Sequence, residues 1–268
     1  MDYKDFITSS LEEAAEIANK NFGKVVGVTK ADDNNQVLTE TDLEIGKLLV
    51  AKIEREYPNF NVIDEEAGVV DKKSDFTWVV DPIDGSSNFA SGVPTYGIYL
   101  GLLEGGFPVA GGIMLPAQNE LYVGIRGEGA FCNGTQIQVS PESNLLKALV
   151  SYQIDGHQEE PSLTEDEAVL LGKIILKTRN LRTSGSAFEL AMVARGAYGG
   201  VVNKTSKIWD NVAAQAVIEA AGGKYTDFYG NEMDYSEPLT KAKQNFTYCA
   251  AAPELHNQLQ EIIGAHTK

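Results

Sequence analysis

Cysteine and histidine are scarce in this chain of 268 residues, which has two cysteines and three histidines. Cys132 and Cys249 lie far apart and outside any Cys-x-x-Cys spacing, so we expect neither a disulfide framework nor a thiolate metal site. A chain of this length with 43% hydrophobic residues can bury a large core without such cross-links. We therefore expect a protein of a reducing compartment, the cytoplasm.

The chain also has few basic residues and no long apolar run. No segment approaches the roughly 20 apolar residues that span a bilayer, and residues 1–6 do not resemble a secretion signal. Lysine and arginine number 22 against 38 acidic residues, a formal net charge of −16. Because such a charge repels nucleic acid and anionic lipid, we expect neither a nucleic-acid nor a membrane partner. A phosphate ligand would need cations from another source.

Hydrophobic periodicity predicts helices and then strands in the first half of the chain. Residues 2–22 show helical spacing, and so does a segment that starts near residue 39, where Thr41 or Asp42 is the expected N-cap, and ends at Pro58. The polar residues 30–36 between them predict a loop. Strands are expected at residues 62–64, 76–81, 96–103, 107–115 and 121–126, with a hairpin at 127–134. Turn residues between the later strands indicate an antiparallel meander.

After Pro141 strands and helices alternate. The pattern predicts strands near residues 148–153, 180–183, 200–202, 223–228 and 246–250, and helices at 165–177, 186–195, 210–221 and from Pro253 onward. We predict an α/β (α+β) fold, a layered α-β-α-β-α sandwich formed by one domain over residues 1–268. Its half from 1 to 140 carries an antiparallel sheet, and its half from 141 to 268 carries a mixed sheet.

Residues 78–89 form the most informative segment. An apolar run ends at Asp81, Pro82 fixes the backbone, and Asp84 follows within a turn of small residues. Gly85 and Ser86 let exposed backbone N–H groups approach an anion closely. Two carboxylates beside such a turn predict a site for metal ions and phosphate.

Further acidic residues also lie at the ends of apolar elements. Glu65 and Glu66 follow a strand, and Asp210 stands at a helix N-terminus. Alone, Asp210 would be interpreted as a cap and the sequence after Asp84 as a tight turn. A cap does not require all these carboxylates together, so their joint occurrence favours a shared site. The donors are hard oxygens, which favours Mg²⁺ over Zn²⁺, and the histidines lie outside every motif: His157, His256 and His266.

Three motifs in this order resemble the inositol monophosphatase family of metal-dependent, lithium-sensitive phosphatases. They are residues 64–66, residues 81–89, and Trp209-Asp210 with the alanine-rich helix that ends at Gly222-Gly223. The resemblance extends over nearly the whole chain. It implies a phosphoric monoester hydrolase that acts on a small phosphorylated substrate, and relatives with this fold are usually homodimers.

The resemblance also implies two or three Mg²⁺ ions. Glu65, Asp81 and the Ile83 carbonyl would hold one ion, Asp81, Asp84 and Asp210 would hold a second, and Glu65 would support a weaker third. Two ions about 3.5–4 Å apart can divide the chemistry, because one generates a hydroxide-like water while the other stabilises the leaving oxygen.

Family members orient the attacking water with a Thr–Asp pair, and the matching residues here are Ser86 and Asp42. Backbone N–H groups of Gly85 and Ser86 would bind the phosphate. Glu66 is a further catalytic candidate, with a solvated carboxylate as the alternative. Lys30 either reaches the site, as loop lysines of the family do, or is a surface lysine.

The alcohol portion of the substrate is expected against Gly185, Ser186, Ala187, Asn203 and Asp210. Asn203 stands where inositol-cleaving members place a glutamate, and it carries no charge. Inositol 1-phosphate is the first candidate substrate. Fructose 1,6-bisphosphate, histidinol phosphate and the nucleotide phosphates adenosine bisphosphate and NADP are alternatives, because relatives cleave them with the same core. A catalytically idle binding protein is disfavoured, since every expected carboxylate is present.

The aromatic residues of the strands predict a core. Trp78, Tyr96, Tyr99 and Phe107 are interpreted as packing residues and not as ligand contacts. Gly111 and Gly112 are expected to permit close packing or a bulge.

Overall fold

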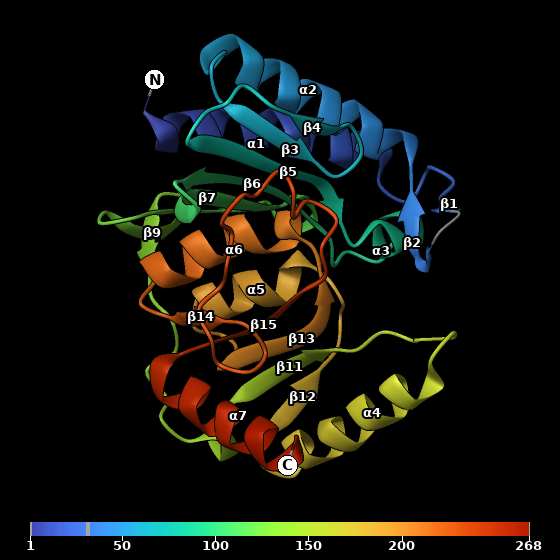
Figure 1. Ribbon diagram of the computed structural model, residues 1–268, viewed down its shortest axis with the longest axis vertical. Helices are drawn as coiled ribbons and strands as arrows, with labels where there is room; N and C mark the ends of the chain where they lie inside the picture. Colours follow the sequence, from blue (N-terminus) through green and yellow to red (C-terminus); the bar gives the residue numbers. More distant parts are fainter. Residues whose placement is uncertain (1, 31–32, 268) are drawn as a thin grey trace.

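Helices and sheets alternate in five layers in the computed structural model, which describes residues 2–30 and 33–267 (Figure 1). The predicted α-β-α-β-α order is confirmed. From the N-terminal side, the helix layers are α1 (Tyr3–Asn21) with α2 (Glu40–Glu56), α5 (Ala187–Ala194) with α6 (Ile208–Ala220), and α4 (Pro161–Ile175) with α7 (Pro253–His266). An eight-stranded sheet and a five-stranded sheet lie between them.

The larger sheet has the strand order β10-β9-β8-β7-β6-β5-β3-β4. All neighbours in it are antiparallel except β3 and β5, which are parallel, so the predicted antiparallel sheet contains one parallel pair. That pair brings the carboxyl ends of two strands to the same edge. The strands are β3 (Asn61–Asp64), β4 (Gly68–Val70), β5 (Phe76–Asp84), β6 (Gly97–Glu104), β7 (Phe107–Leu115), β8 (Glu120–Ile125), β9 (Gly129–Cys132) and β10 (Thr135–Ile137).

The smaller sheet has the order β12-β11-β13-β15-β14 and is mixed, as predicted. Strand β11 is parallel to β12 and to β13, and β15 is antiparallel to β13 and β14. The strands are β11 (Leu149–Gln153), β12 (Asn180–Arg182), β13 (Gly200–Ser206), β14 (Lys224–Thr226) and β15 (Phe246–Ala251).

Glycines of the larger sheet let α6 lie directly on it. A Cβ atom at Gly111 would lie 2.4 Å from the Ala213 carbonyl oxygen, and one at Gly101 would lie 2.7 Å from the Ala213 nitrogen. Alanine on the facing side of α6 completes the close contact. The expected role of Gly111 in close packing is thus confirmed, and the approach holds the second turn of α6 against the sheet.

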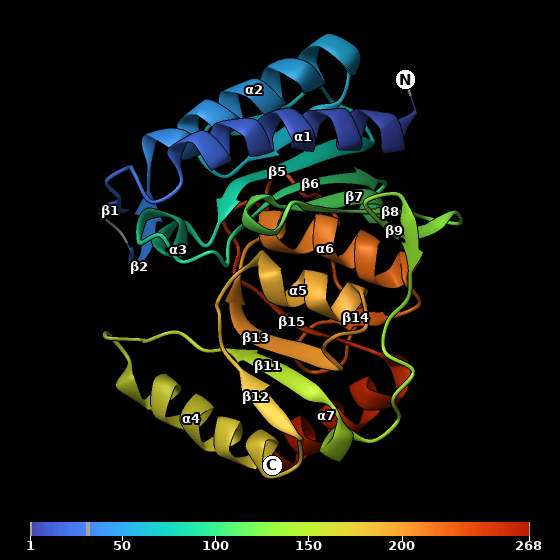
Figure 2. The ribbon, with the colours of Figure 1, turned by 180° about the vertical axis from the view of Figure 1, so that it is seen from behind.

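The segment between the first two helices differs from the prediction. Instead of a loop over residues 30–36, strands β1 (Val28–Lys30) and β2 (Asp33–Leu38) form an antiparallel hairpin, with residues 31–32 outside the described part. This hairpin lies beside the short helix α3 (Ser86–Ala90) at one side of the molecule (Figure 2). Neither β4 nor α3 was predicted, because both are too short for a periodic pattern.

The N-cap of α2 is Thr39, so the predicted cap at Thr41 or Asp42 is wrong. Thr39 Oγ1 accepts hydrogen bonds from the N–H groups of Thr41 and Asp42, and the Asp42 carboxylate accepts one from the Thr39 N–H at 2.8 Å. Asp42 is therefore the third residue of a capping box. The predicted cap lay two or three residues after the observed one.

Two other boundaries and one core residue also differ. Helix α4 begins at Pro161, not at residue 165, and α6 begins at Ile208, two residues before the predicted start. Trp78, Tyr96 and Tyr99 are buried as predicted, but Phe107 is 62% exposed because it stands at the start of β7, next to a turn. Among the described helices, none combines the length and the apolar composition that crossing a membrane would require.

Candidate metal and phosphate site

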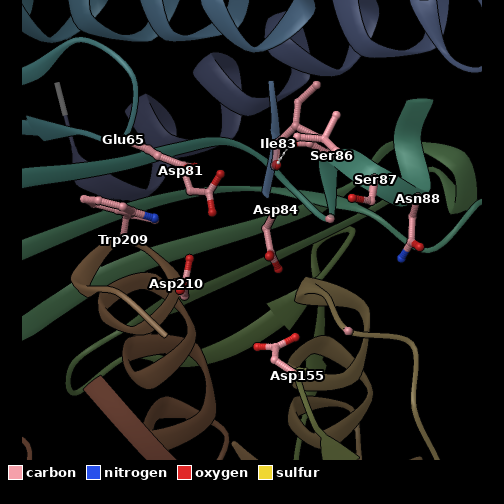
Figure 3. Close-up of a pocket in the computed structure, with 13 residues that line it drawn as sticks. Glu65, Asp81, Ile83, Asp84, Ser86, Ser87, Asn88, Asp155, Trp209 and Asp210 are labelled. Atoms are coloured by element: carbon pink, nitrogen blue, oxygen red, sulfur yellow. Dashed lines mark hydrogen bonds between the residues drawn. The ribbon is translucent and has the colours of Figure 1, made fainter. Parts of the chain in front are cut away.

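An acidic cavity of about 290 Å³ lies where β3, β5, α3 and α6 meet. Asp81, Asp84 and Asp210 each offer one carboxylate oxygen there, and these three oxygens lie within 4.8 Å of one another. Glu65 lines the same cavity. Figure 3 shows these side chains directed toward a common space from separate elements. The structure thus brings together four acidic residues of the three sequence motifs.

A bulge in β5 directs Asp81 and Asp84 to the same side. Residues three apart in a regular strand point to opposite faces. Here Asp81 pairs with Tyr99 and Asp84 with Gly97, so three steps on β5 oppose two steps on β6. The extra residue reverses the alternation. Pro82 fits this irregular position because it has no N–H group to pair.

The parallel pairing of β3 with β5 places Glu65 beside Asp81. The N–H group of Glu65 donates to the Val80 carbonyl oxygen at 3.2 Å. Oδ1 of Asp64 accepts hydrogen bonds from the next turn, from the Glu66 N–H at 2.9 Å and the Ala67 N–H at 2.6 Å. This Asx turn fixes the backbone that carries Glu65.

Asp210 lies in the first turn of α6. Its Oδ2 accepts the Lys207 N–H at 2.6 Å, which is a capping contact. Asp210 is therefore the third residue of a capping box whose N-cap is Lys207, so it supports the cap without being the cap itself, and it also lines the acidic cavity. Asp210 can accept the Lys207 N–H and still offer an oxygen to the cavity, because a carboxylate has two oxygens.

Burial and mutual repulsion make this carboxylate cluster unfavourable without a cation. Burial raises the pKa of Asp81 well above its usual range, and the nearby charges of Glu65 and Asp84 raise it further. Burial likewise raises the pKa of Asp84 far above its usual range, that of Glu65 to about 7 and that of Asp210 to about 6. Within the described part of the chain, Oδ1 of Asp81 is buried without a hydrogen-bond partner.

The donor set fits a hard divalent cation. Four acidic residues that the motifs predict and Ile83 line the cavity, and no histidine or cysteine belongs to its described lining. Oxygen-only sites are typical of Mg²⁺, and a bound cation would satisfy the orphaned oxygen of Asp81. The assignment of individual ligands stays a prediction.

Lys30 supplies positive charge at the edge of the cluster. Its Nζ lies 2.7 Å from Oε1 of Glu65 and 2.7 Å from Oε1 of Glu66. Burial opposes the charge on Lys30, but the two glutamates outweigh it and raise the pKa of the amine. Lys30 therefore contacts Glu65 of the cavity lining, whereas neither Lys30 nor Glu66 lines the cavity itself. The catalytic role of Glu66 stays a prediction.

The predicted pair of Ser86 and Asp42 is in contact. Ser86 Oγ lies 2.7 Å from Asp42 Oδ1 and 2.7 Å from the Ile83 carbonyl oxygen. Asp42 is buried, and its other oxygen is held by the capping box of α2. Ser86 also lines the acidic cavity, so its hydroxyl connects that cavity to the Asp42 carboxylate.

The residues at the start of α3, from Gly85 to Asn88, line the cavity. Gly85 has φ +86°, and a Cβ atom there would lie 2.9 Å from the Ser186 Cβ, so the position requires glycine. The N–H groups of the first helical turn have no acceptors within the helix. Asn88 fixes this turn by donating to the carbonyl oxygens of Thr95 at 2.8 Å and Ser184 at 2.9 Å.

A second cavity of about 380 Å³ adjoins the first and shares Asp84, Asp155, Gly185 and Asp210 with it. Asn203 lines this cavity, as expected for a residue near the alcohol portion of a substrate. Its side chain donates to Gln153 Oε1 at 2.8 Å and accepts the Thr205 N–H at 2.6 Å.

The other predicted substrate contacts divide into two groups. Gly185 lines both cavities. Ser186 and Ala187 are buried and line neither: Ser186 Oγ caps α5 by accepting the Phe188 N–H, and the Ala187 N–H donates to Asp84. Ser186 and Ala187 therefore hold the structure next to the cavities and do not line them.

Asp155 was missed by the sequence reasoning, although it lines both cavities. It follows β11, which is parallel to both of its neighbours. Ligands bind preferentially outside the carboxyl ends of parallel strands, so the position of Asp155 after a predicted strand was a usable signal. Figure 3 shows Asp155 on the opposite side of the space from Glu65 and Asp81.

Comparisons with known proteins match this chain to one family over nearly its whole length. A sequence profile described as the inositol monophosphatase family matches residues 3–266. A Mesembryanthemum crystallinum protein named inositol monophosphatase is 30% identical, in an alignment that covers 88% of this chain and 93% of that protein. A Thermotoga maritima protein named fructose-1,6-bisphosphatase/inositol-1-monophosphatase is 31% identical, with coverage of 87% and 88%. A solved Thermotoga maritima IMPase superposes with a TM-score of 0.87 at 28% identity, covering 100% and 98%.

Proposed function

The chain belongs to the inositol monophosphatase family and is a phosphoric monoester hydrolase, and from that premise we propose that it cleaves the phosphate ester of a small polyol with Mg²⁺ as its cofactor. The observation that carries the proposal is the buried cluster of Asp81, Asp84 and Asp210 beside the amides of α3. Carboxylates alone repel phosphate, so a phosphate can bind beside this cluster only when cations lie between the carboxylates and the phosphate.

We assign Glu65, Asp81, Asp84, Asp210 and the Ile83 carbonyl to two or three Mg²⁺ ions. When bound, the ions supply positive charge to the phosphate and lower the pKa of the water that attacks it. Lithium is expected to inhibit, as in the family. The amides of Gly85 and Ser86 bind phosphate oxygens without adding charge.

Ser86 and Asp42 form the proton path of this proposal. Ser86 Oγ accepts a hydrogen bond from the attacking water and passes its own proton toward Asp42 Oδ1, which lies 2.7 Å away. General-base assistance of this kind typically contributes about 10²- to 10⁴-fold in rate. Asp42 acts through Ser86 and orients it.

Inositol 1-phosphate is the first candidate substrate. Fructose 1,6-bisphosphate is the second, because a relative with 31% identity carries both activities in its name. The alcohol portion of either substrate would lie in the second cavity beside Gly185 and Asn203. Histidinol phosphate, adenosine bisphosphate and NADP complete the panel of candidates.

A phosphate-release assay over this panel tests the proposal. We expect Mg²⁺-dependent turnover that is highest for a polyol phosphate and is abolished by a chelator. If no compound of the panel is hydrolysed in the presence of Mg²⁺, the proposed function fails, and a catalytically idle binding protein becomes the better interpretation.

We also propose a cytoplasmic homodimer that folds as one domain. Dimers are usual in the family, and helix α4 with its C-cap residue exposes apolar side chains that a second copy could cover, namely Val169, Ile175 and Leu176. The reducing compartment is inferred from Cys132 and Cys249, which are both free thiols. Light scattering of the purified protein tests the dimer, and a mass equal to 29.0 kDa would reject it.

A further inference from the structure

Tyr99 carries a buried hydroxyl group without a partner next to the acidic cluster. It lies on β6 directly opposite Asp81 of β5, and its side chain is 0% exposed. Within residues 2–30 and 33–267, its Oη forms no hydrogen bond. Tyr99 also lines the second cavity, together with Asp84 and Asn203.

Three polar side chains of this cavity, Gln153, Asn203 and Tyr248, are already paired with one another. Gln153 donates to Glu189 Oε2 at 2.8 Å and to the Ser186 carbonyl at 3.0 Å. Its Oε1 accepts hydrogen bonds from Asn203 at 2.8 Å and from the Tyr248 hydroxyl at 2.6 Å. The amide of Gln153 therefore has no capacity left for a ligand.

Glu189 is saturated in the same way. Besides Gln153, it accepts hydrogen bonds from the Ser151 hydroxyl at 3.0 Å and from the N–H groups of Gly185 at 3.1 Å and Ser186 at 3.0 Å. This network fixes the wall of the cavity before any ligand arrives. In contrast to Gln153 and Glu189, the Tyr99 hydroxyl is a donor without an acceptor among the described residues.

Buried hydroxyl groups in native proteins almost always have a hydrogen-bond partner. From this orphaned phenol in a cavity wall, we infer that Tyr99 determines specificity by donating a hydrogen bond to a hydroxyl group of the polyol portion of the substrate. The inference rests on the proposed function and refines it. A hydroxyl group suits the position because it accepts from Tyr99 and still donates to a carboxylate of the same cavity, such as Asp155.

The chain offers a matched control in Tyr96. Its side chain is also 0% exposed, and its Oη likewise has no partner among the described residues. Its ring packs against Phe22 and Phe89, with centroids 5.0 Å and 4.9 Å away, and it lines neither cavity. Tyr96→Phe and Tyr99→Phe therefore remove the same atom from two buried sites, of which only one adjoins the second cavity.

The experiment compares kcat/KM for inositol 1-phosphate with kcat/KM for p-nitrophenyl phosphate, whose alcohol portion has no further hydroxyl group. The ratio of the two values is expected to fall by about 5- to 30-fold in Tyr99→Phe, the range of one lost hydrogen bond to substrate. In Tyr96→Phe the ratio should stay within about twofold of wild type, since that ring touches no cavity.

Two results would overturn the inference. An unchanged ratio in Tyr99→Phe would mean that Tyr99 binds only an ordered water, and an equal fall in both variants would indicate a general packing effect. Failure of the proposed function is distinguishable, because wild-type protein would then hydrolyse no polyol phosphate at all. The thermal melting of each variant, followed by circular dichroism, verifies that it is folded.

Discussion

The hydroxyl of Ser86 lies 2.7 Å from Oδ1 of Asp42, although 44 residues separate the two in sequence. The capping box of α2 holds the Asp42 carboxylate through the Thr39 N–H, and the αL conformation of Gly85 starts the turn that presents Ser86. Two local backbone motifs thus set the distance between a proton donor and its acceptor.

Removal of this hydroxyl should slow catalysis without disrupting the fold. We expect Ser86→Ala to lower kcat by about 10²- to 10⁴-fold, because the attacking water loses its general-base contact. Ser86→Thr keeps the hydroxyl and is the matched control, with kcat within about tenfold of wild type. Phosphate release at saturating Mg²⁺ measures both. Wild-type kcat in Ser86→Ala would remove Ser86 and Asp42 from the mechanism.

Neutralising Asp84 should separate function from stability. Asp84→Asn is expected to remove most turnover, because one ligand of the proposed cation site is lost. In the metal-free protein the same change should raise Tm, since it removes one charge from a repelling cluster. Differential scanning fluorimetry with and without Mg²⁺ measures this. Asp75→Asn, at an exposed position, is the control and should change neither quantity. A metal-free Tm below wild type would contradict the repulsion.

The stability of the metal-free protein should depend on pH. Burial raises the folded-state pKa of Asp210 to about 6 and that of Glu65 to about 7, from ordinary values of 3.8 and 4.5. A carboxyl group whose pKa is raised by folding stabilises the folded state fully when the pH lies below its unfolded-state pKa. This stabilisation is lost as the pH rises through its folded-state pKa. Metal-free Tm should therefore fall between about pH 4 and 7. Asp210→Asn should make the metal-free Tm depend less steeply on pH. A pH dependence as steep as that of wild type would contradict the raised pKa of Asp210.

Glu65 and Glu66 should differ in function although both contact Lys30. Glu65 lines the acidic cavity and Glu66 does not. We expect Glu65→Gln to reduce kcat by more than about 100-fold and to raise the Mg²⁺ concentration needed, and Glu66→Gln to reduce kcat by less than about tenfold. A Mg²⁺ titration of phosphate release measures both variants. Equal losses would mean that Glu66 participates directly.

Close packing of α6 should be sensitive to a single methyl group. At Gly111 a Cβ atom would lie 2.4 Å from the Ala213 carbonyl oxygen, so Gly111→Ala should destabilise the fold by about 1–3 kcal/mol. Gly172→Ala in α4 is the control, because a Cβ atom there has no neighbour within 4 Å, and alanine should add about 0.5–1 kcal/mol of helix stability. Urea unfolding distinguishes them. A neutral Gly111→Ala would mean that α6 shifts freely.

Sequence reasoning located the acidic cluster because its members belong to contiguous motifs. Asp81 and Asp84 are three residues apart, and the turn residues around them are informative by themselves. The bulge that turns both to one side requires the register with β6, which no single strand reveals. The layer order was likewise predictable, because long periodic segments dominate it.

The missed features depend on contacts that sequence periodicity does not encode. The β1–β2 hairpin is polar, so its strands lack an apolar pattern. Tyr99 was interpreted as a packing residue, which its burial supports, but the lack of a partner for its hydroxyl appears only when the neighbouring side chains are placed. Asp155 was overlooked because one carboxylate after a strand has no motif around it.

The most direct test of the central claim is anomalous scattering from a crystal grown with Mn²⁺, which occupies oxygen-ligand sites of this kind. The account predicts anomalous peaks in direct contact with carboxylate oxygens of Asp81, Asp84 and Asp210, with Glu65 at one of them. A crystal of active protein in which no peak touches these carboxylates would contradict it.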